Sequence, residues 1–200
     1  MDLEERIQAL RQGGDLDGAA TQAIEGYGPE VLGFLVTLMR GENDARDVFA
    51  QACEDVWRGL AGFQGRSSLR TWFYTLARHA ATRFRRSPHR RAGRHVSLSA
   101  ASQAAERVRT QTLPHLRTEV KDKFAAIRDA LEPEDRALLV LRVDRNKSWN
   151  EIAHVLAPDE VGSGDGLARA SARLRKRFQG VKDDIRARAK QAGLIPDEES

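Results

Sequence analysis

The sequence predicts an all-α protein made of two small helical domains joined by a flexible basic linker. Three observations support this prediction: apolar residues recur at helical spacing, no useful stretch alternates like a strand, and the helical pattern lapses over residues 87–117. With 200 residues, 40% of them hydrophobic, the chain can build two small cores. We therefore expect domains at 1–86 and 118–190, a linker at 87–117 and a tail at 191–200.

The first domain is expected to begin with two helices. Helical spacing of apolar residues indicates a first helix with Leu3, Ile7 and Leu10 on one face. Gly13-Gly14 would end it. Pro29 suits an early position in the second helix. The apolar residues that follow it are Val31, Leu32, Leu35, Leu38 and Met39.

Two more helices follow, separated by a glycine-containing loop. The most regular apolar stripe of the chain consists of Ala45, Val48, Phe49, Ala52, Cys53, Val56, Trp57 and Leu60. The segment from Gly62 to Arg66 interrupts it, and Ser67 or Ser68 can cap a further helix. The stripe of that helix consists of Leu69, Trp72, Phe73, Leu76, Ala77, Ala80 and Phe84.

Periodicity returns after the linker, in which a short Ala-rich helix is expected near residues 100–110. Apolar spacing resumes at Val120, Phe124, Ile127 and Leu131. Pro133 would open the next helix, and Ser148 with Glu151 has the spacing of a capping box. After a long turn, the last helix has apolar positions at Leu167, Ala170, Leu174, Phe178, Val181 and Ile185.

Basic residues are concentrated in two blocks within an acidic frame. Residues 56–105 contain ten arginines and no acid, and residues 166–190 contain nine basic residues and two acids. The rest of the chain carries a net charge of −13, so the formal total of +4 hides an uneven distribution. Each block can be a solvated helix face, but two blocks on separate amphipathic helices favour binding to nucleic acid.

The sequence contains no clear set of catalytic residues, and we expect neither catalytic activity, nor a metal, nor a cofactor. The five histidines lack the spacing of metal ligands, and Cys53 lies in an apolar stripe. The segment Gly162-Ser163-Gly164-Asp165-Gly166 follows a helix and lacks the Gly-Lys-Ser/Thr ending of a phosphate loop. A single cysteine, an acidic start and no membrane-length apolar stretch lead us to expect a cytoplasmic protein.

Two segments point to nucleic-acid chemistry. Residues 148–188 have the layout of a helix-turn-helix: a short capped helix containing the small Ala153, a turn, and a long basic helix. Aromatic and arginine residues alternate around the earlier glycine loop, where Phe63 is hard to assign to a core and could stack on an unpaired base. Most of the other aromatic residues there are expected in the core.

At these residues the chain resembles the extracytoplasmic-function sigma factors, the two-domain group of the sigma-70 family. Three segments of this chain resemble region 2 of that family: Asp44-Ala45-Arg46-Asp47-Val48, Val56-Trp57-Arg58 and Phe63-Gln64-Gly65-Arg66-Ser67-Ser68-Leu69-Arg70-Thr71-Trp72. Three later segments resemble region 4: Leu131-Glu132-Pro133-Glu134-Asp135-Arg136, Glu151-Ile152-Ala153 and Leu174-Arg175-Lys176-Arg177-Phe178. The resemblance covers most of residues 20–190.

The resemblance implies three interfaces. Core RNA polymerase would be bound by Arg46, Asp47, Gln51, Glu54, Asp55 and Arg58. The melted −10 promoter element would be bound by Phe63, Gln64, Gly65, Arg66, Ser67, Arg70, Trp72, Arg78, His79 and Arg83. The duplex −35 element would be bound by Arg173, Arg175, Lys176, Arg177 and Lys182. An anti-sigma factor is a further partner that the resemblance implies.

The chain departs from the family pattern at three places. Ala50-Gln51 replaces the usual Gln-Glu, His79 stands where Asn is common, and the turn from Ala157 to about Ala170 is long. If the recognition helix begins at Leu174, the residues that face DNA are Arg175, Lys176, Arg177 and Lys182. If it begins at Leu167, Arg169 and Arg173 face DNA instead. The first register is favoured, although one helix could also run continuously from Asp165.

The sequence thus predicts an alternative sigma factor that directs promoter recognition and DNA melting by core RNA polymerase. Two other functions remain open at this point. One is a stand-alone helix-turn-helix regulator that binds duplex DNA without polymerase. The other is a sigma-like adaptor that binds an anti-sigma partner.

Overall fold

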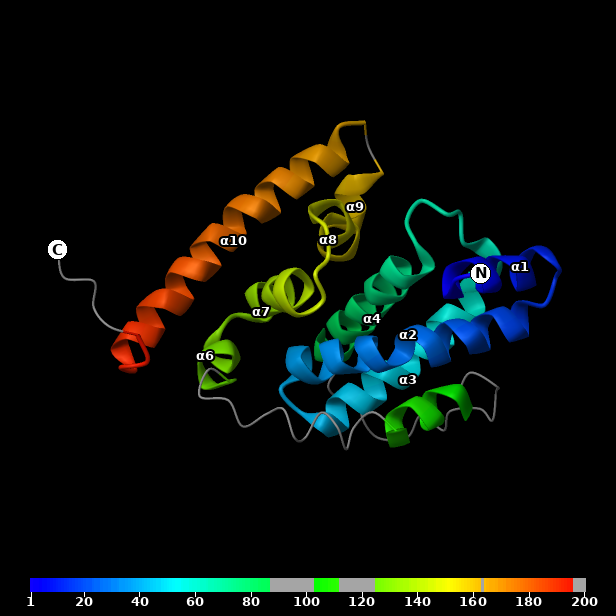
Figure 1. Ribbon diagram of the computed structural model, residues 1–200, viewed down its shortest axis with the longest axis horizontal. Helices are drawn as coiled ribbons and strands as arrows, with labels where there is room; N and C mark the ends of the chain where they lie inside the picture. The colour runs from blue at the N-terminus through cyan, green and yellow to red at the C-terminus, as the bar shows by residue number, and fades with distance from the viewer. Residues whose placement is uncertain (87–102, 112–124, 163, 196–200) are drawn as a thin grey trace. The chain divides into compact units, whose positions relative to one another are not determined.

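The computed structural model describes residues 1–86, 103–111, 125–162 and 164–195. Within these ranges the secondary structure is helical and contains no strand, which confirms the all-α fold. The chain divides into two compact units, Met1–Arg117 and Thr118–Ser200 (Figure 1). No helix in the described ranges has both the length and the apolar composition needed to cross a membrane.

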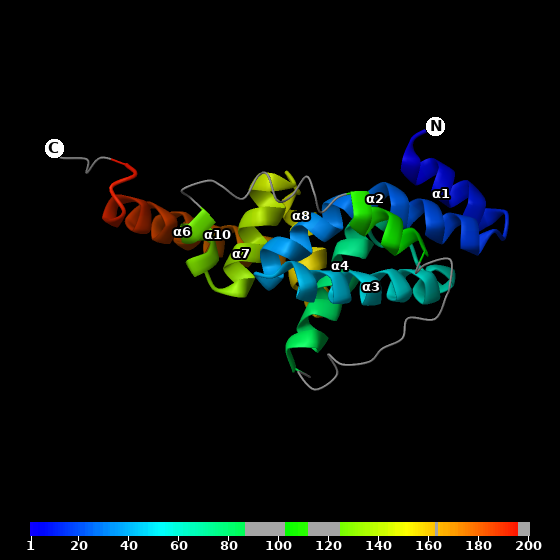
Figure 2. The same ribbon diagram turned by 90° about the horizontal axis from the view of Figure 1, so that it is seen from below.

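The first unit is a bundle whose long helices pack on one another. Its elements are α1 (Leu3–Gln12), α2 (Leu16–Met39), α3 (Glu42–Gly59), the 3₁₀ turn η1 (Leu60–Gly62) and α4 (Leu69–Arg86). Helices α2, α3 and α4 contact one another, and α1 packs on α2 (Figure 2). The bundle therefore brings the two ends of the glycine loop, at η1 and α4, close to α1.

The first helix forms where the apolar spacing predicts it. Asp2 caps α1 by accepting a hydrogen bond from the Glu5 N–H, and the Glu5 carboxylate accepts one from the Asp2 N–H in return. Gly13 ends the helix, as expected. Ile7 is fully buried, so this helix belongs to the core of the unit.

The prediction for Pro29 is wrong, because this residue lies inside α2 rather than near its start. Proline removes one backbone hydrogen bond and tends to kink a helix. The helix continues through it because apolar residues on both sides are buried in the same core. Those residues are Ala19, Ala20, Ala23 and Ile24 before Pro29, and Val31, Leu32, Phe34 and Leu35 after it.

The apolar stripes of α3 and α4 meet in the core. Phe49 of α3 stacks on Phe73 of α4 with ring centroids 6.2 Å apart. Tyr74 of α4 meets Phe34 of α2 edge to face at 5.4 Å. Cys53 is fully buried, as expected for a core cysteine, and burial raises the pKa of its thiol. This packing gives both helices a fixed outer face.

A helix at residues 103–111 also belongs to the first unit, and it agrees with the short Ala-rich helix expected near 100–110. Ala104, Ala105 and Val108 are buried. Figures 1 and 2 show this helix in green beside α2 and α3.

The second unit consists of short helices packed on one long helix. Its elements are α6 (Ala125–Ala130), α7 (Pro133–Leu139), the π-helical turn η3 (Val140–Asp144), α8 (Trp149–Leu156), α9 (Pro158–Val161) and α10 (Gly166–Gln191). The predicted capping box forms at the start of α8. The short α9 was not predicted, and it occupies part of the long turn. Val120 and Phe124 of the predicted periodicity lie outside the described residues.

Candidate nucleic-acid interface

The loop between η1 and α4 ends in a serine cap. The Thr71 N–H donates to the Ser68 Oγ at 3.1 Å, and the Trp72 N–H donates to the Ser68 carbonyl at 2.9 Å. Of the two serines that the sequence offered as caps, Ser68 is therefore the one used. Gly65 adopts a φ of 69°, a left-handed conformation that glycine reaches without strain. The loop thus has a defined turn and a defined end.

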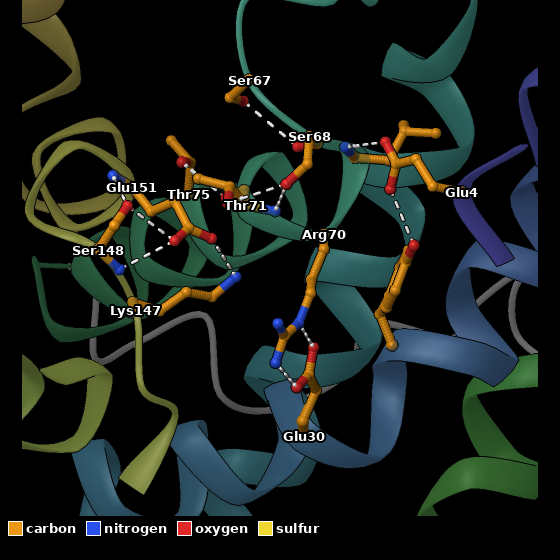
Figure 3. A network of polar contacts seen from close by, with 12 residues as sticks. Glu4, Glu30, Ser67, Ser68, Arg70, Thr71, Thr75, Lys147, Ser148 and Glu151 are labelled. Atoms are coloured by element: carbon orange, nitrogen blue, oxygen red, sulfur yellow. Dashed lines mark hydrogen bonds and ion pairs between the residues drawn. The ribbon is translucent and has the colours of Figure 1, made fainter. Parts of the chain in front are cut away.

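A carboxylate from α1 fixes the first turn of α4. The Leu69 N–H donates to Glu4 Oε1 at 2.7 Å, and the Tyr27 hydroxyl donates to Glu4 Oε2 at 2.8 Å (Figure 3). Burial raises the pKa of Tyr27, and the hydrogen bond to Glu4 raises it further, so the hydroxyl keeps its proton and remains the donor. Glu4 therefore joins α1, α2 and α4 at the end of the loop.

Phe63 is packed inside this arrangement. Its side chain is 7% exposed, its ring lies 5.0 Å from that of Trp72, and the Arg11 guanidinium lies 5.3 Å from its centroid. Arg11 also donates to the Phe63 carbonyl at 2.7 Å. The interpretation that Phe63 is hard to place in a core is wrong, because α1 supplies the covering residue. Its proposed stacking on an unpaired base stays a prediction that requires the ring to be uncovered.

Arg70, which belongs to the predicted −10 set, is bonded to a carboxylate within the chain. Its Nε and Nη2 donate to the two carboxylate oxygens of Glu30 on α2, both at 2.5 Å (Figure 3). Such a two-point contact between a guanidinium and a carboxylate is among the stronger charged hydrogen bonds. Arg70 therefore ties α4 to α2 in the described structure.

The other predicted −10 residues lie on α4 and in the loop before it. Trp72, His79 and Arg83 lie at i, i+7 and i+11 on α4 and share one stripe. Arg78 is half-buried and lies on a different side of the helix. Gln64, Gly65 and Arg66 are exposed in the loop at the start of α4, and Ser67 is half-buried. Among the predicted −10 residues, Phe63 is therefore buried and Arg70 is bonded to Glu30 of α2.

The residues predicted to bind polymerase make ion pairs along α3. Arg46 pairs with Glu42 at 2.9 Å, and Arg58 pairs with Glu54 at 3.3 Å. Gln51 donates to Asp55 at 3.1 Å. These contacts follow helical i, i+4 spacing, which explains why one face of α3 remains polar. Asp47 is exposed on the same face.

One ion pair connects two of the predicted surfaces. Arg83 of α4 pairs with Asp55 of α3, so a residue predicted to bind DNA contacts one predicted to bind polymerase. The two surfaces are therefore adjacent within the first unit.

In the second unit, a charged network fixes the start of α8. Lys147 is 1% exposed and donates to Glu151 at 2.9 Å. The Ser148 N–H and hydroxyl also donate to Glu151, at 2.9 and 2.8 Å (Figure 3). Burial alone would raise the pKa of Glu151, but these hydrogen bonds outweigh it and lower the pKa to about 2.

Helix α8 packs closely on α10. Ala153 is fully buried, as the helix-turn-helix pattern predicts for a small residue at this point. The Ser171 hydroxyl is 2.9 Å from Asn150 Oδ1 and 3.3 Å from the Trp149 carbonyl, and it donates to these acceptors. Trp149 meets Phe178 edge to face at 5.6 Å. These contacts fix α10 against α8.

Helix α10 is one continuous helix from Gly166, so Leu174 lies in its interior and is buried. The favoured expectation that Leu174 opens this helix is wrong, because the buried positions Gly166, Ala170 and Leu174 continue one helical stripe. The alternative in which the helix runs on from Asp165 describes the structure. Which residues contact DNA stays a prediction.

The predicted −35 residues are distributed over three sides of α10. Arg175 lies over the Trp149 ring at 5.7 Å, and Lys182 lies over Phe178 at the same distance. Arg177 donates to Asp135 of α7 at 2.6 Å. Arg173 and Lys176 lie on the outer side, and Arg169 extends their stripe toward the start of the helix. Arg173 is paired with Glu160 of α9.

Three contributors to these surfaces had no role in the sequence prediction. They are Glu4 and Arg11 of α1 and Trp149 of α8. In the described residues, no group of His, Cys, Asp or Glu side chains is arranged to hold a metal ion.

Known proteins similar to this chain in sequence are RNA polymerase sigma factors. Residues 23–91 match the family description of sigma-70 region 2. The RNA polymerase sigma factor YlaC of Bacillus subtilis (strain 168) is 26% identical over 163 residues, which cover 80% of this chain and 92% of that protein. The ECF RNA polymerase sigma factor SigG of Mycobacterium tuberculosis (strain H37Rv) is 26% identical over 170 residues, which cover 75% of this chain.

The chain covers 46% of the length of SigG. No solved structure matches the chain significantly.

Residues 23–91 of the helical bundle are therefore similar to region 2 of the sigma-70 family, and the full-length relatives similar to the chain are named as RNA polymerase sigma factors. Of these relatives, SigG is named as an ECF RNA polymerase sigma factor.

Proposed function

We propose that this chain is an alternative sigma factor that binds core RNA polymerase and directs promoter recognition and DNA melting. The names of its relatives support the role of an RNA polymerase sigma factor. The assignment of particular residues to polymerase, the −10 element and the −35 element is part of the same proposal.

The outer surface of α4 and its preceding loop carries this proposal. Exposed Gln64 and Arg66 share a loop with Phe63, whose ring lies 5.0 Å from that of the half-buried Trp72, within the segment that matches region 2. Proteins that hold single-stranded DNA combine basic groups along the backbone with aromatic faces on which bases stack. This surface has both components, so we assign it to the melted non-template strand.

The other two interfaces follow from their charge. The polar face of α3 mixes acids and bases in pairs that a polymerase surface can exchange for its own. The basic outer stripe of α10 follows a short helix and a turn, and the second helix of a helix-turn-helix is the one that enters the major groove. We therefore assign α3 to polymerase and α10 to the duplex −35 element.

Run-off transcription with purified core polymerase tests the proposal. The full chain should yield a transcript from a promoter of its own genome, and scrambling the −10 or −35 element should abolish it. Absence of any promoter-dependent transcript from a folded chain would overturn the proposal. Promoter binding without polymerase would instead favour the stand-alone regulator.

A further inference from the structure

Three side chains from η3 and α10 meet at the indole ring of Trp149, the first residue of α8. The Arg142 guanidinium of η3 lies 5.0 Å from the ring centroid, and that of Arg175 of α10 lies 5.7 Å from it. The Phe178 ring meets the indole edge to face, with centroids 5.6 Å apart. Aromatic rings attract guanidinium groups at such distances, so Trp149 holds two cations close to each other.

The backbone around Arg142 places this residue beside Trp149. Residues Val140–Asp144 form a π-helical turn, a rare geometry that is frequent at functional sites. The turn is closed by the Arg145 N–H, which donates to the first carbonyl of the turn at 2.9 Å. Asn146 then adopts a φ of 48°, in the left-handed region, so the chain turns sharply before α8 begins.

A hydrogen bond fixes the Arg142 guanidinium as well. Its Nη1 donates to the Lys147 carbonyl at 2.9 Å, and Lys147 is itself buried and bonded to Glu151. Among the described residues, Arg142 and Arg175 have no ion pair, whereas the neighbouring Arg177 is held by a carboxylate of α7. The two guanidinium groups on Trp149 are therefore ordered and keep N–H donors for a negatively charged ligand.

We infer that Arg142 and Arg175, held on the Trp149 ring, bind neighbouring phosphate groups of the duplex DNA backbone. The planar guanidinium matches the geometry of phosphate oxygens, and stacking on an aromatic face leaves its N–H edge open to them. Trp149 is a positioning residue, because it acts through the two arginines. The site extends the duplex interface that we propose for α10, and it rests on that proposed function.

The position of the pair favours phosphates over base edges. In a helix-turn-helix the second helix enters the major groove, whereas the first helix crosses the DNA backbone. Trp149 begins α8, which is the first helix of this motif. Cations gathered at its start are therefore placed to contact the backbone. Such contacts fix the orientation of a protein on duplex DNA without reading its sequence.

Salt dependence of binding by the holoenzyme tests the site. Arg142→Gln should lower the slope of log affinity against log salt by about one, because one phosphate is no longer neutralised. The change should be the same for an intact and a scrambled −35 duplex, so the ratio of their affinities should not change. Arg186→Gln is the matched control, since Arg186 is an exposed arginine of α10 three turns beyond Arg175. It should leave the slope nearly unchanged.

Substitution of Trp149 separates positioning from charge. Trp149→Leu keeps an apolar side chain beside Phe178 and every charge of the chain, yet it should weaken binding to both duplexes about two- to fivefold. Trp149→Phe should restore most of the affinity, since its ring offers a face to the same cations. Trp149→Leu should have little further effect in a chain that already carries Arg142→Gln and Arg175→Gln, because residues that act through one another are not additive.

The phosphate site is overturned if Arg142→Gln and Arg186→Gln give the same slope. It is also overturned if Trp149→Leu weakens binding equally with and without the two arginines, since a purely structural role of the ring gives that result. If Arg142→Gln weakens assembly with polymerase while the salt slope stays unchanged, the arginine binds an acidic protein surface instead. Cooperative unfolding of every variant, followed by circular dichroism, excludes loss of the fold.

Nuclear magnetic resonance of the full chain without polymerase tests the site separately from the proposed function. An aromatic ring shifts the signals of nearby nuclei, so Trp149→Leu should move the side-chain Nε–H signals of Arg142 and Arg175 but not that of Arg186. A short duplex of unrelated sequence should also move the first two signals, because backbone contacts do not depend on sequence. If these signals respond to the duplex while run-off transcription fails, only the proposed function is overturned. If transcription succeeds and the signals do not respond, only the phosphate site is overturned.

Discussion

At the scale of single residues, the candidate DNA-binding loop is held by side chains that lie far from it in sequence. Arg11 bonds a carbonyl 52 positions away, and Glu4 bonds a backbone N–H 65 positions away. Neither contact can be recognised from a pattern in the nearby sequence, because helical spacing shows only which face of α1 is apolar. The sequence could therefore identify the loop and its exposed residues but not the burial of Phe63.

Arg11 is expected to stabilise this loop. Arg11→Ala removes a charged hydrogen bond and a contact with the Phe63 ring, and we expect the free energy of unfolding of the first unit to fall by about 1–2 kcal/mol. Promoter opening, followed by permanganate reactivity of the −10 bases, should slow as well. Arg11→Lys should restore part of both, because lysine keeps a charged donor.

Arg6→Ala is the control for Arg11→Ala, since Arg6 is an exposed arginine on the same helix. It should change neither unfolding nor promoter opening. Equal effects of the two substitutions would contradict a specific role for Arg11.

The network around Glu151 should make the second unit sensitive to acid. The folded state holds the pKa of Glu151 at about 2, below its ordinary value of 4.5. The stabilisation is therefore complete above about pH 4.5 and is lost as the pH falls toward 2. Because about a third of the side chain is exposed, we expect a loss of only about 1–2 kcal/mol.

Denaturant unfolding of the chain, followed through Trp149 fluorescence at pH 5 and pH 3, measures this loss. Glu151→Gln should be less stable at pH 5 and should show a smaller change between the two pH values. Asp159→Asn, at an exposed acid nearby, should behave like the unsubstituted chain. If Glu151→Gln and the unsubstituted chain lost the same stability between pH 5 and pH 3, the acid sensitivity would come from other groups.

At the scale of helices, apolar spacing predicted the elements well where one face is buried in one core. This holds for α1, α3, α4 and α8, whose predicted apolar positions or caps appear in the structure. It failed at Pro29, because tertiary packing on both sides outweighs the preference of proline for helix starts.

The start of α10 makes a prediction about DNA reading. In a helix-turn-helix, residues near the start of the second helix contact base edges. Since α10 begins at Gly166, Arg169 should reach the bases, whereas Arg177 is held by Asp135. Arg169→Ala should reduce discrimination between intact and scrambled −35 elements by about 1–3 kcal/mol.

Competition binding by the holoenzyme, with intact and scrambled −35 duplexes, measures that discrimination. Arg177→Ala should weaken binding to both duplexes similarly and leave their ratio nearly unchanged. A larger loss of discrimination from Arg175→Ala than from Arg169→Ala would favour the later register, in which Arg175 faces the bases.

At the scale of the whole molecule, the formal charge of +4 is the sum of segments that carry opposite net charges. Ten arginines without an acid lie in the segment that contains α4, and nine basic residues against two acids lie in the segment that contains α10. The net charge of −13 elsewhere includes the acids of α3 that we assign to polymerase. Many of the arginines are paired within the chain, so the count of positive charges is larger than the number of phosphates that we expect them to neutralise.

Salt dependence of promoter binding should reveal this difference between paired and unpaired charges. Each lysine or arginine that neutralises a phosphate adds about one to the slope of log affinity against log salt. In the described part of the chain Lys176 has no ion pair, whereas its neighbour Arg177 is bonded to Asp135. Lys176→Gln should therefore lower the slope by about one, and Arg177→Gln by clearly less.

Filter binding of the holoenzyme to one promoter over a series of salt concentrations gives both slopes. Asp135→Asn supplies the complementary variant, because it releases Arg177 while leaving the arginine in place. It should raise the slope toward that expected for one more phosphate contact. Equal slopes for Lys176→Gln and Arg177→Gln would mean that the Arg177–Asp135 ion pair breaks on binding DNA without a cost in affinity. The salt dependence would then follow the formal charge of α10.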